Sequence, residues 1–259
     1  DTGPHNDSFK EAETRTAERT GEGVETWTPP QGLPDVYIAM GQTAENVAQS
    51  KGVSRQAQDE WGVRSQNRAE DAASRGFFER EITPYTLPDG TVVTADDGIR
   101  AGTTYESVSQ LNPVFRPDGT VTAGNACPLN DGAAAVVVMS EDKASELGIT
   151  PLAKIVASGV SALNPEIMGL GPIEAINQTL SRAKMKIDDI DLVEINEAFA
   201  AQVLPSAEET GIDHDKLNIN GGSIALGHPF GMTGARIMTT LINGLEDADK
   251  EFGLETMCV

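Results

Sequence analysis

The sequence predicts an α/β layered fold with a mainly parallel central sheet. Two continuous apolar runs of strand length, AAAVVVM at 133–139 and KIVASGV at 154–160, are typical of strands buried on both faces. DLVEI at 191–195 predicts a third strand. Segments with helical periodicity follow these runs, and strands that alternate with helices indicate parallel pairing.

The part of the chain before these strands predicts few strands of its own. Residues 1–35 are polar and rich in Thr, Glu, Gly and Pro, which predicts an extended surface segment. A helix is predicted over 36–52, where a glycine ends it, and a second over 54–76, where a serine begins it. Short strand-like pieces separated by PDG turns occupy 81–116. This region therefore reads as a helical, loop-rich insertion domain.

Helices and one strand are predicted in the rest of the chain. Pro172 stands at the favoured first position of a helix whose apolar face carries Ile176 and Leu180. The remaining predicted elements are helices at 141–148, from Glu197 and at 233–245, and a last strand at 254–259. The predicted domains are an insertion at 1–122, a strand and helix at 123–150, and a second α/β half at 151–259 that stops inside a strand.

Composition excludes several classes of function. Forty acidic and 19 basic residues give a net charge of −21, which disfavours nucleic acid and anionic membranes as partners. No apolar run is long enough to span a membrane, and no signal peptide is visible. Two cysteines are too few for a disulfide framework, so a reduced, cytoplasmic setting is expected. Three histidines without CxxC or HExxH spacing predict no metal site.

Asn196 follows the predicted strand 191–195, where a helix is expected to begin. An amide at this place can donate to an oxyanion or hold a water molecule, and the helix N-terminus adds positive potential. The alternative is a plain helix cap, a role for which asparagine is well suited, and local chemistry favours the cap.

His228 lies in NGGSIALGHPFGMTGAR, where two glycines precede a short apolar segment interpreted as a strand. Pro229 restricts His228 to extended backbone geometry, and Gly227 permits close approach of a ligand or another backbone. An imidazole held in this way can act as a general base at neutral pH. A structural histidine is normally the commoner case, but the glycines on both sides of His228 favour a function. His5 and His214 lack such flanking residues and are interpreted as surface residues.

The residues around the two cysteines give weaker support for a role in catalysis or binding. Cys258 is one residue from the end of the sequence, and Cys127 lies in a loop of small residues, TAGNACPLNDGAAA. A thiol serves as a base or nucleophile only when its neighbours tune its pKa, which the sequence does not reveal. Taken alone, Cys258 reads as a buried, inert cysteine.

Four segments in this order resemble regions of the thiolase family: AGNACPLNDGAAA, NEAFAAQ, GGSIALGHPFGMTGAR and LETMCV. MGQTAENVA and EIMGLGP are further matches, so the resemblance covers nearly the whole chain. It implies the layered thiolase fold and places the chain in the C-terminal portion of such a protein, with the N-terminal half largely absent. Within that fold, 123–150 corresponds to the end of the N-terminal half and 151–259 to the C-terminal half.

The resemblance implies acyl transfer between coenzyme A thioesters, by Claisen condensation or thiolysis of acetoacetyl-CoA or longer 3-ketoacyl-CoA. His228 would activate the acyl-carrying thiol and bind the thioester oxygen, and Asn196 would complete that oxyanion site through a water molecule. Cys258 would move the proton on the α-carbon of acetyl-CoA. These roles agree with the demands of enolate chemistry, which needs a positioned base and donors for the oxygen.

The resemblance also implies a binding site for coenzyme A, which is a substrate, so no separate cofactor is expected. Arg100 and Ser107 would lie near the nucleotide, and Arg100 offers a local cation in an acidic protein. The residues expected along the pantetheine tunnel are Ala123, Cys127, Met168, Ala198 and Phe199. Serine is common in the family at the place of Cys127, so a hydrogen bond to the pantetheine arm is expected to be weakened. A homo-oligomer, dimer or tetramer, is the expected assembly.

One expected feature is missing from the sequence pattern. No segment resembles the family's nucleophilic cysteine motif, nor the glycine run that follows the cysteine at the place of Cys258. We therefore expect the isolated chain to be inactive, and its parent to be an acetyl-CoA acyltransferase of fatty acid and lipid metabolism. Two alternatives stay open: a thiolase-like protein that binds acyl-CoA or lipid without catalysis, and a structural subunit of a larger complex.

Overall fold

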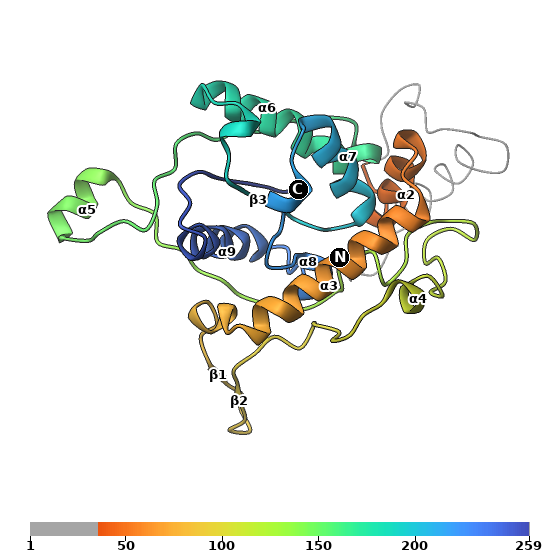
Figure 1. Cartoon of the computed structure of the whole chain (residues 1–259), viewed down its shortest axis with the longest axis horizontal. Helices are drawn as coiled ribbons and strands as arrows, with labels where there is room; N and C mark the ends of the chain where they lie inside the picture. Colours follow the sequence, from red (N-terminus) through yellow and green to blue (C-terminus); the bar gives the residue numbers. More distant parts are fainter. Residues whose placement is uncertain (1–35, 259) are drawn as a thin grey trace.

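A computed structural model describes residues 36–258 of the chain, so the segment predicted at 1–35, with His5, lies outside the described residues. Figure 1 shows a compact body of helices around a small sheet, from which α5 and the β1–β2 hairpin project. The helices are α2 (Met40–Lys51), α3 (Arg55–Ser74), α4 (Tyr105–Val108), α5 (Glu141–Leu147), α6 (Gly171–Ala183), α7 (Ala200–Thr210), α8 (Ser223–Leu226) and α9 (Thr233–Asp247). The strands are β1 (Tyr85–Thr86), β2 (Val92–Val93), β3 (Leu192–Ile195) and β4 (Gly253–Thr256). Short 3₁₀-helical segments occur at Phe77–Arg80, Pro165–Leu170 (η2), Ile187–Asp189 and His214–Lys216.

The predicted helix ends are confirmed where the sequence carries capping residues. Ser54 caps α3, since its hydroxyl accepts a hydrogen bond from the backbone of Ala57 at 3.1 Å. Gly52 ends α2 with a φ of 66°, a left-handed conformation that glycine adopts without steric cost. The helices predicted at 141–148, from Pro172 and at 233–245 correspond to α5, α6 and α9.

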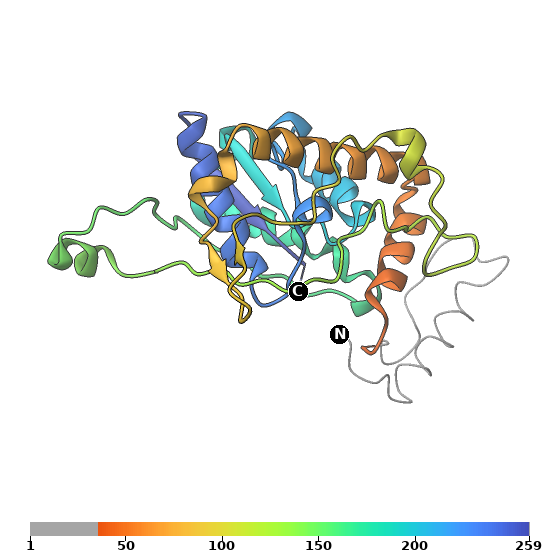
Figure 2. The same cartoon turned by 90° about the horizontal axis from the view of Figure 1, so that it is seen from below.

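The sheet at the centre of the body consists of β3 and β4, which pair in parallel. Val193 pairs with Leu254, and both belong to the largest buried apolar cluster, together with side chains of α6 and α7. Glu194 pairs with Glu255 on the opposite face, which is covered by α9. The sheet therefore has helices on both faces, as Figure 2 shows, and the predicted α/β layering and parallel pairing are confirmed for these two strands.

The two apolar runs predicted as buried strands are not strands in the structure. Residues 133–139 and 154–160 are extended but largely exposed: Val137 and Val160 each keep 83% of their surface accessible. A strand buried on both faces needs a neighbouring strand to pair with and helices above and below it. Among residues 36–258, no strand pairs with either run, so their apolar composition does not lead to burial.

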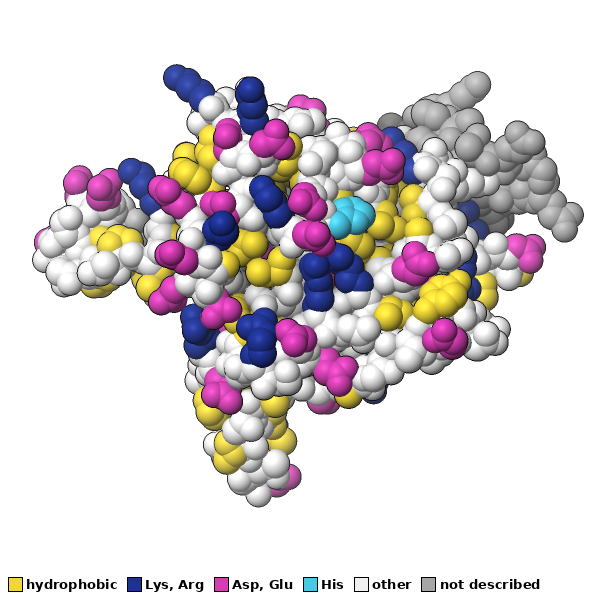
Figure 3. Space-filling model, in the orientation of Figure 1, with side chains coloured by type: hydrophobic (Ala, Val, Ile, Leu, Met, Phe, Trp, Pro, Cys, Tyr) yellow, Lys and Arg dark blue, Asp and Glu magenta, His cyan; other side chains and the backbone are white. Residues whose placement is uncertain are grey.

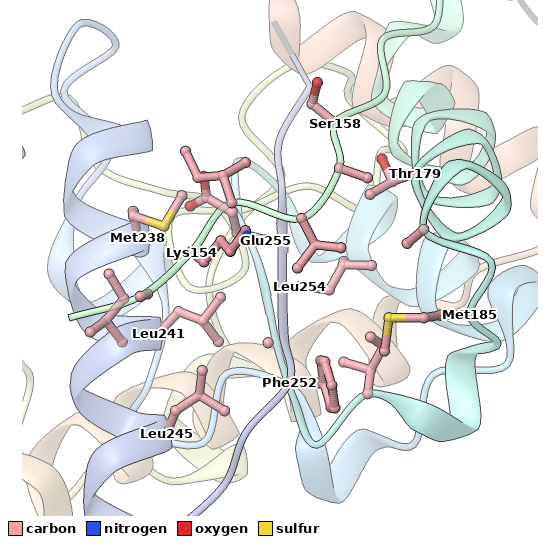
Figure 4. Close-up of a pocket in the computed structure, with 18 of the residues that line it drawn as sticks. Lys154, Ser158, Thr179, Met185, Met238, Leu241, Leu245, Phe252, Leu254 and Glu255 are labelled. Atoms are coloured by element: carbon pink, nitrogen blue, oxygen red, sulfur yellow. The ribbon is translucent and has the colours of Figure 1, made fainter. Parts of the chain in front are cut away.

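The run 154–160 passes instead along the free edge of β4. Together with α6, α9 and β4 it encloses a hollow of about 1000 Å³. Figure 4 shows the run crossing from α9 toward α6, with Lys154 beside Met238 and Leu241 of α9 and Ser158 on the side of Thr179 of α6. Asn196, His228 and Cys258 do not line this hollow.

The segment predicted as strand-like between 81 and 116 is mostly irregular. The two-residue strands β1 and β2 form an antiparallel hairpin around the first PDG turn, and α4 was not predicted. The long helix α3 spans the body and contacts α4, α7 and α8. Figure 3 shows acidic side chains scattered over one face with basic ones among them, consistent with a dispersed negative charge. No helix within residues 36–258 is long and apolar enough to cross a membrane.

The paired acids on the α9 face of the sheet are held against an arginine. Burial raises the pKa of Glu194 to about 8 and that of Glu255 to about 7, and Arg236 of α9 acts in the opposite direction on both. Glu194 is only 3% exposed. At neutral pH, Glu194 is therefore largely protonated in the folded protein.

Glu194→Gln tests this buried acid. The pKa of Glu194 is higher in the folded state than its ordinary value of 4.5. The stability that its bound proton contributes is therefore complete below pH 4.5 and is lost as the pH rises through about 8. We expect the substitution to raise the free energy of unfolding at pH 8 relative to pH 5 by about 3 kcal/mol, since most of the rise in the pKa of Glu194 is expressed between these two pH values and one pKa unit corresponds to about 1.36 kcal/mol. Urea unfolding at both pH values measures this difference, and an equal effect at both would contradict the assignment.

Candidate active site

The candidate site lies where β3 and β4 end side by side. The backbone N–H of Asn196 donates to the carbonyl of Thr256 at 3.0 Å, which extends the ladder one residue beyond β3. Cys258 follows β4 by two residues. Because the carboxyl ends of parallel strands share one edge of a sheet, the backbone positions of Asn196 and Cys258 are fixed next to each other.

Asn196 is a partner of His228 and not a helix cap. Its Nδ2 lies 3.3 Å from the Nε2 of His228, and the side chain is fully buried. The helix α7 begins four residues later, at Ala200, with Phe199 at the cap position. The interpretation as a cap is therefore wrong, because the irregular segment between β3 and α7 turns the amide toward His228.

His228 is held from three directions. Its backbone N–H donates to Asn130 Oδ1 at 3.0 Å, its Nδ1 lies 2.6 Å from the Thr233 hydroxyl, and its ring meets Phe230 edge-on at 5.2 Å. The preceding Gly227 has a φ of 91°, so the loop does require a glycine there. The apolar residues before it form the short helix α8, so their interpretation as a strand is wrong: four residues closed by glycine complete one helical turn.

The imidazole of His228 is neutral at pH 7. Burial lowers its pKa, and the positive charge of Arg236 lowers it further. A neutral imidazole can accept a proton or a hydrogen bond through one nitrogen, as a general base requires. His214, by contrast, is exposed and rests edge-on against Trp61 at 5.3 Å, as expected for a surface histidine.

Both cysteines are free, and both thiols are neutral. Burial raises the pKa of Cys258 to about 11. Burial raises the pKa of Cys127 to about 12, with a further contribution from the neighbouring Cys258. A thiol activated as a nucleophile has a lowered pKa, so neither cysteine has that property here.

Several residues predicted for the pantetheine tunnel lie together beside Cys127. The backbone N–H of Cys127 donates to the carbonyl of Ala198 at 3.0 Å, and Ala126 forms an isolated β-bridge with Phe199. Ala123 is exposed at the start of this loop, and Met168 is half-buried in η2. The loop 123–127 is thereby joined to the segment that follows Asn196.

Arg100 and Ser107 lie outside this cluster of contacts. Both are exposed; the backbone N–H of Arg100 donates to Gln66 Oε1 at 2.8 Å, and the Ser107 side chain bonds to Thr104 in a capping box. None of their described hydrogen bonds reaches the Asn196–His228 pair. Their predicted contact with the nucleotide of coenzyme A stays a prediction.

Glu197 was missed by the sequence reasoning, although it is adjacent to Asn196. Its carboxylate is fully buried and accepts four hydrogen bonds. The donors are Trp61 Nε1 at 3.0 Å, Ser65 Oγ at 2.5 Å, Asn218 Nδ2 at 2.9 Å and the Ile224 backbone at 3.2 Å. A charged residue inside an otherwise apolar stretch was the available signal, since a buried acid requires partners.

Glu197 ties α3 and α8 to the end of β3, so its removal should loosen the site. We expect Glu197→Ala to lower the free energy of unfolding by about 3 kcal/mol or more, because four buried donors lose their acceptor. Glu174→Ala is the matched control: this exposed glutamate of α6 bonds only to Gln178 among the described residues, and its loss should change stability by less than about 0.5 kcal/mol. Equal effects in urea unfolding would refute the role of Glu197.

Two family models match the sequence. The model described as thiolase, N-terminal domain, matches residues 5–142, and the model described as thiolase, C-terminal domain, matches residues 149–259. The expectation that the N-terminal half is largely absent is therefore not supported. Residues 1–122 carry few strand patterns, which is why the sequence alone predicts an insertion there. The expectation that the nucleophilic cysteine segment is missing is likewise not supported, and the predicted boundaries at 122 and 150 stay predictions.

Known proteins match most of this chain. Acetyl-CoA acetyltransferase of Cupriavidus necator is 50% identical over 234 residues, which cover 88% of this chain and 60% of the relative. The crystal structure of Bacillus anthracis acetyl-CoA acetyltransferase superposes with a TM-score of 0.83 at 43% identity, covering 91% of this chain and 59% of that one. The dimeric peroxisomal thiolase of Saccharomyces cerevisiae gives 0.83 at 43% identity, covering 86% and 57%.

The chain thus spans about 60% of the length of these relatives. Within that span the agreement in sequence and in backbone is high, and the two family models together match nearly every residue. On this evidence the chain belongs to the thiolase family.

Proposed function

We propose that the protein transfers acyl groups between coenzyme A thioesters, as a thiolase acting on acetoacetyl-CoA or longer 3-ketoacyl-CoA. The observation that carries the proposal is the buried Asn196–His228 pair, joined at 3.3 Å beside the ends of β3 and β4. An amide donor and a neutral imidazole at one sheet edge can hold the oxygen of a thioester while charge develops on it.

Each residue has a role in this proposal. Asn196 supplies the donor for the thioester oxygen, directly or through a water molecule. His228 accepts the proton of the acyl-carrying thiol at Nε2 and, once protonated there, donates to the same oxygen. Cys258 exchanges the proton on the α-carbon. Since burial raises the pKa of Cys258 to about 11, its thiol is protonated at neutral pH and is suited to return a proton to the carbanion released in thiolysis. Condensation needs the thiolate, a minor form at that pH.

Coenzyme A is a substrate in this proposal, and the chain's own residues bind it. The loop at Cys127 and the segment Ala198–Phe199 would line the pantetheine arm, with Ala123 and Met168 at its sides. Arg100 and Ser107 would meet the nucleotide, where the exposed guanidinium can pair with phosphate. The proposal includes a homo-oligomer in the cytoplasm that serves fatty acid metabolism; support for an oligomer is that the yeast relative is dimeric.

The inactivity expected of the isolated 259-residue chain is not shown by the comparisons, so the test uses a reaction that requires only the residues described above. Acetyl-CoA in deuterium oxide loses protons from its methyl carbon when a base and an enolate site are present together. We expect the protein to accelerate this exchange, with a rate that rises about tenfold per pH unit between pH 7 and 9, because the thiolate fraction of Cys258 grows at that rate below a pKa of about 11.

Matched histidine variants locate the activity. His228→Ala should lower the exchange rate about 100-fold, since positioned acid–base groups contribute about 10²–10⁴. His214→Gln should leave the rate within about twofold, because His214 is exposed and packs on Trp61. Mass spectrometry of acetyl-CoA measures the exchange. A rate equal to that in buffer, or an unchanged rate in His228→Ala, would refute the proposed function, whereas binding without exchange would favour a non-catalytic binder.

A further inference from the structure

A chain of hydrogen bonds leads from α9 through α8 to the candidate site. Arg236 Nη2 donates to Ser223 Oγ at 2.9 Å, and Ser223 Oγ lies 2.5 Å from Asn196 Oδ1. Asn196 Nδ2 is in turn 3.3 Å from His228 Nε2. On the far side of the imidazole, Nδ1 lies 2.6 Å from the Thr233 hydroxyl, which donates to the carbonyl of Pro229 at 2.9 Å.

The two ends of this chain fix the direction of its protons. A guanidinium has donors and no acceptor, so the Ser223 oxygen must accept from Arg236. The hydroxyl proton of Ser223 is then free to go to Asn196 Oδ1, which can only accept. At the other end the Thr233 hydroxyl can donate to the Pro229 carbonyl, which leaves its oxygen to accept from Nδ1 of the imidazole, the arrangement that agrees with the Asn196 end.

The direction of the chain specifies one state of the Asn196–His228 pair. With Oδ1 turned toward Ser223, the amide presents Nδ2, a donor, to the imidazole. His228 therefore carries its proton on Nδ1 and offers the lone pair of Nε2 toward Asn196. A flipped amide would reverse both choices: it would place Oδ1 against Nε2 and require the proton there.

Because the groups around it are buried, Ser223 strongly favours one orientation of the Asn196 amide. Ser223, Asn196 and Thr233 are each fully buried, so a wrongly turned amide leaves buried donors and acceptors without partners. Two atoms of Arg236, Nε and Nη1, are buried without a hydrogen-bond partner among the described residues. Among the described residues, the Arg236 side chain therefore makes its hydrogen bond to Ser223 through Nη2.

We propose that Ser223 and Arg236 are positioning residues that orient the Asn196 amide and thereby keep the Nε2 of His228 unprotonated. Neither residue touches the reacting atoms; both act through Asn196. Only the catalytic consequence of this orientation rests on the proposed function. The tautomer of His228 is set in the protein without substrate. Under that function, an imidazole with a free Nε2 is ready to take the proton of a thiol, and an Nε2–H imidazole is not.

The experiment reads the His228 tautomer by nitrogen-15 NMR of the two ring nitrogens, without substrate. The unmodified protein should show a proton on Nδ1. Ser223→Ala removes the donor to Oδ1, so the Nε2–H form should rise to about 80% of the population or more, and acetyl-CoA exchange should fall about fivefold, because a turned amide no longer offers Nδ2 to the thioester oxygen. Thr240→Val is the matched control: it removes a buried hydroxyl that lies on α9 and bonds to Glu81 at 2.9 Å, and it should leave both readouts unchanged.

Arg236→Met provides a second variant, because Arg236 is only partly buried and its loss opens no fully buried site. It should shift the tautomer in the same direction as Ser223→Ala, and it should raise the pKa of His228, since the positive charge of Arg236 lowers that pKa. An unchanged tautomer in both variants, or an equal shift in Thr240→Val, would overturn the proposal. A tautomer shift as expected, with no exchange in the unmodified protein, would support the positioning role and refute the proposed function.

Discussion

The parallel pairing of β3 and β4 is the constraint on which the rest of this structure depends. It places the ends of two strands at one edge, and the hydrogen bond from Asn196 to Thr256 extends the pairing to the first residue of the site. The alternation of side chains along the same strands decides what each face contains. Val193 and Leu254 face the apolar cluster, and Glu194 and Glu255 face α9 and Arg236.

Buried polar groups give the site its definition, since an apolar core alone would not select one arrangement of Asn196 and His228. Glu197 joins α3, α8 and the end of β3 through four hydrogen bonds, so the backbone on both sides of Asn196 is anchored. Arg236 has two effects: it lowers the pKa of His228 through its charge and it orients Asn196 through Ser223. Groups of this kind are costly when left unsatisfied, which makes alternative arrangements unfavourable.

Local sequence signals predicted the helices well because capping and periodicity act within a few residues, as at Ser54 and Gly52. The same reasoning failed for 133–139 and 154–160, since burial of a strand depends on partners elsewhere, and composition does not show whether those partners are present. Resemblance to the thiolase family identified Asn196 and His228, whereas local chemistry alone favoured a cap. Ser223 and Arg236 were missed because their contacts join residues on separate helices, which no local pattern reveals.

The most direct test of the central claim is a crystal structure of the protein with acetyl-CoA. The thioester oxygen should lie within hydrogen-bonding distance, about 2.7–3.2 Å, of Asn196 Nδ2 or of a water molecule bound to it, beside the imidazole of His228. The methyl carbon should face Cys258. A thioester seated instead in the hollow between β4 and residues 151–159, away from Asn196 and His228, would contradict this account.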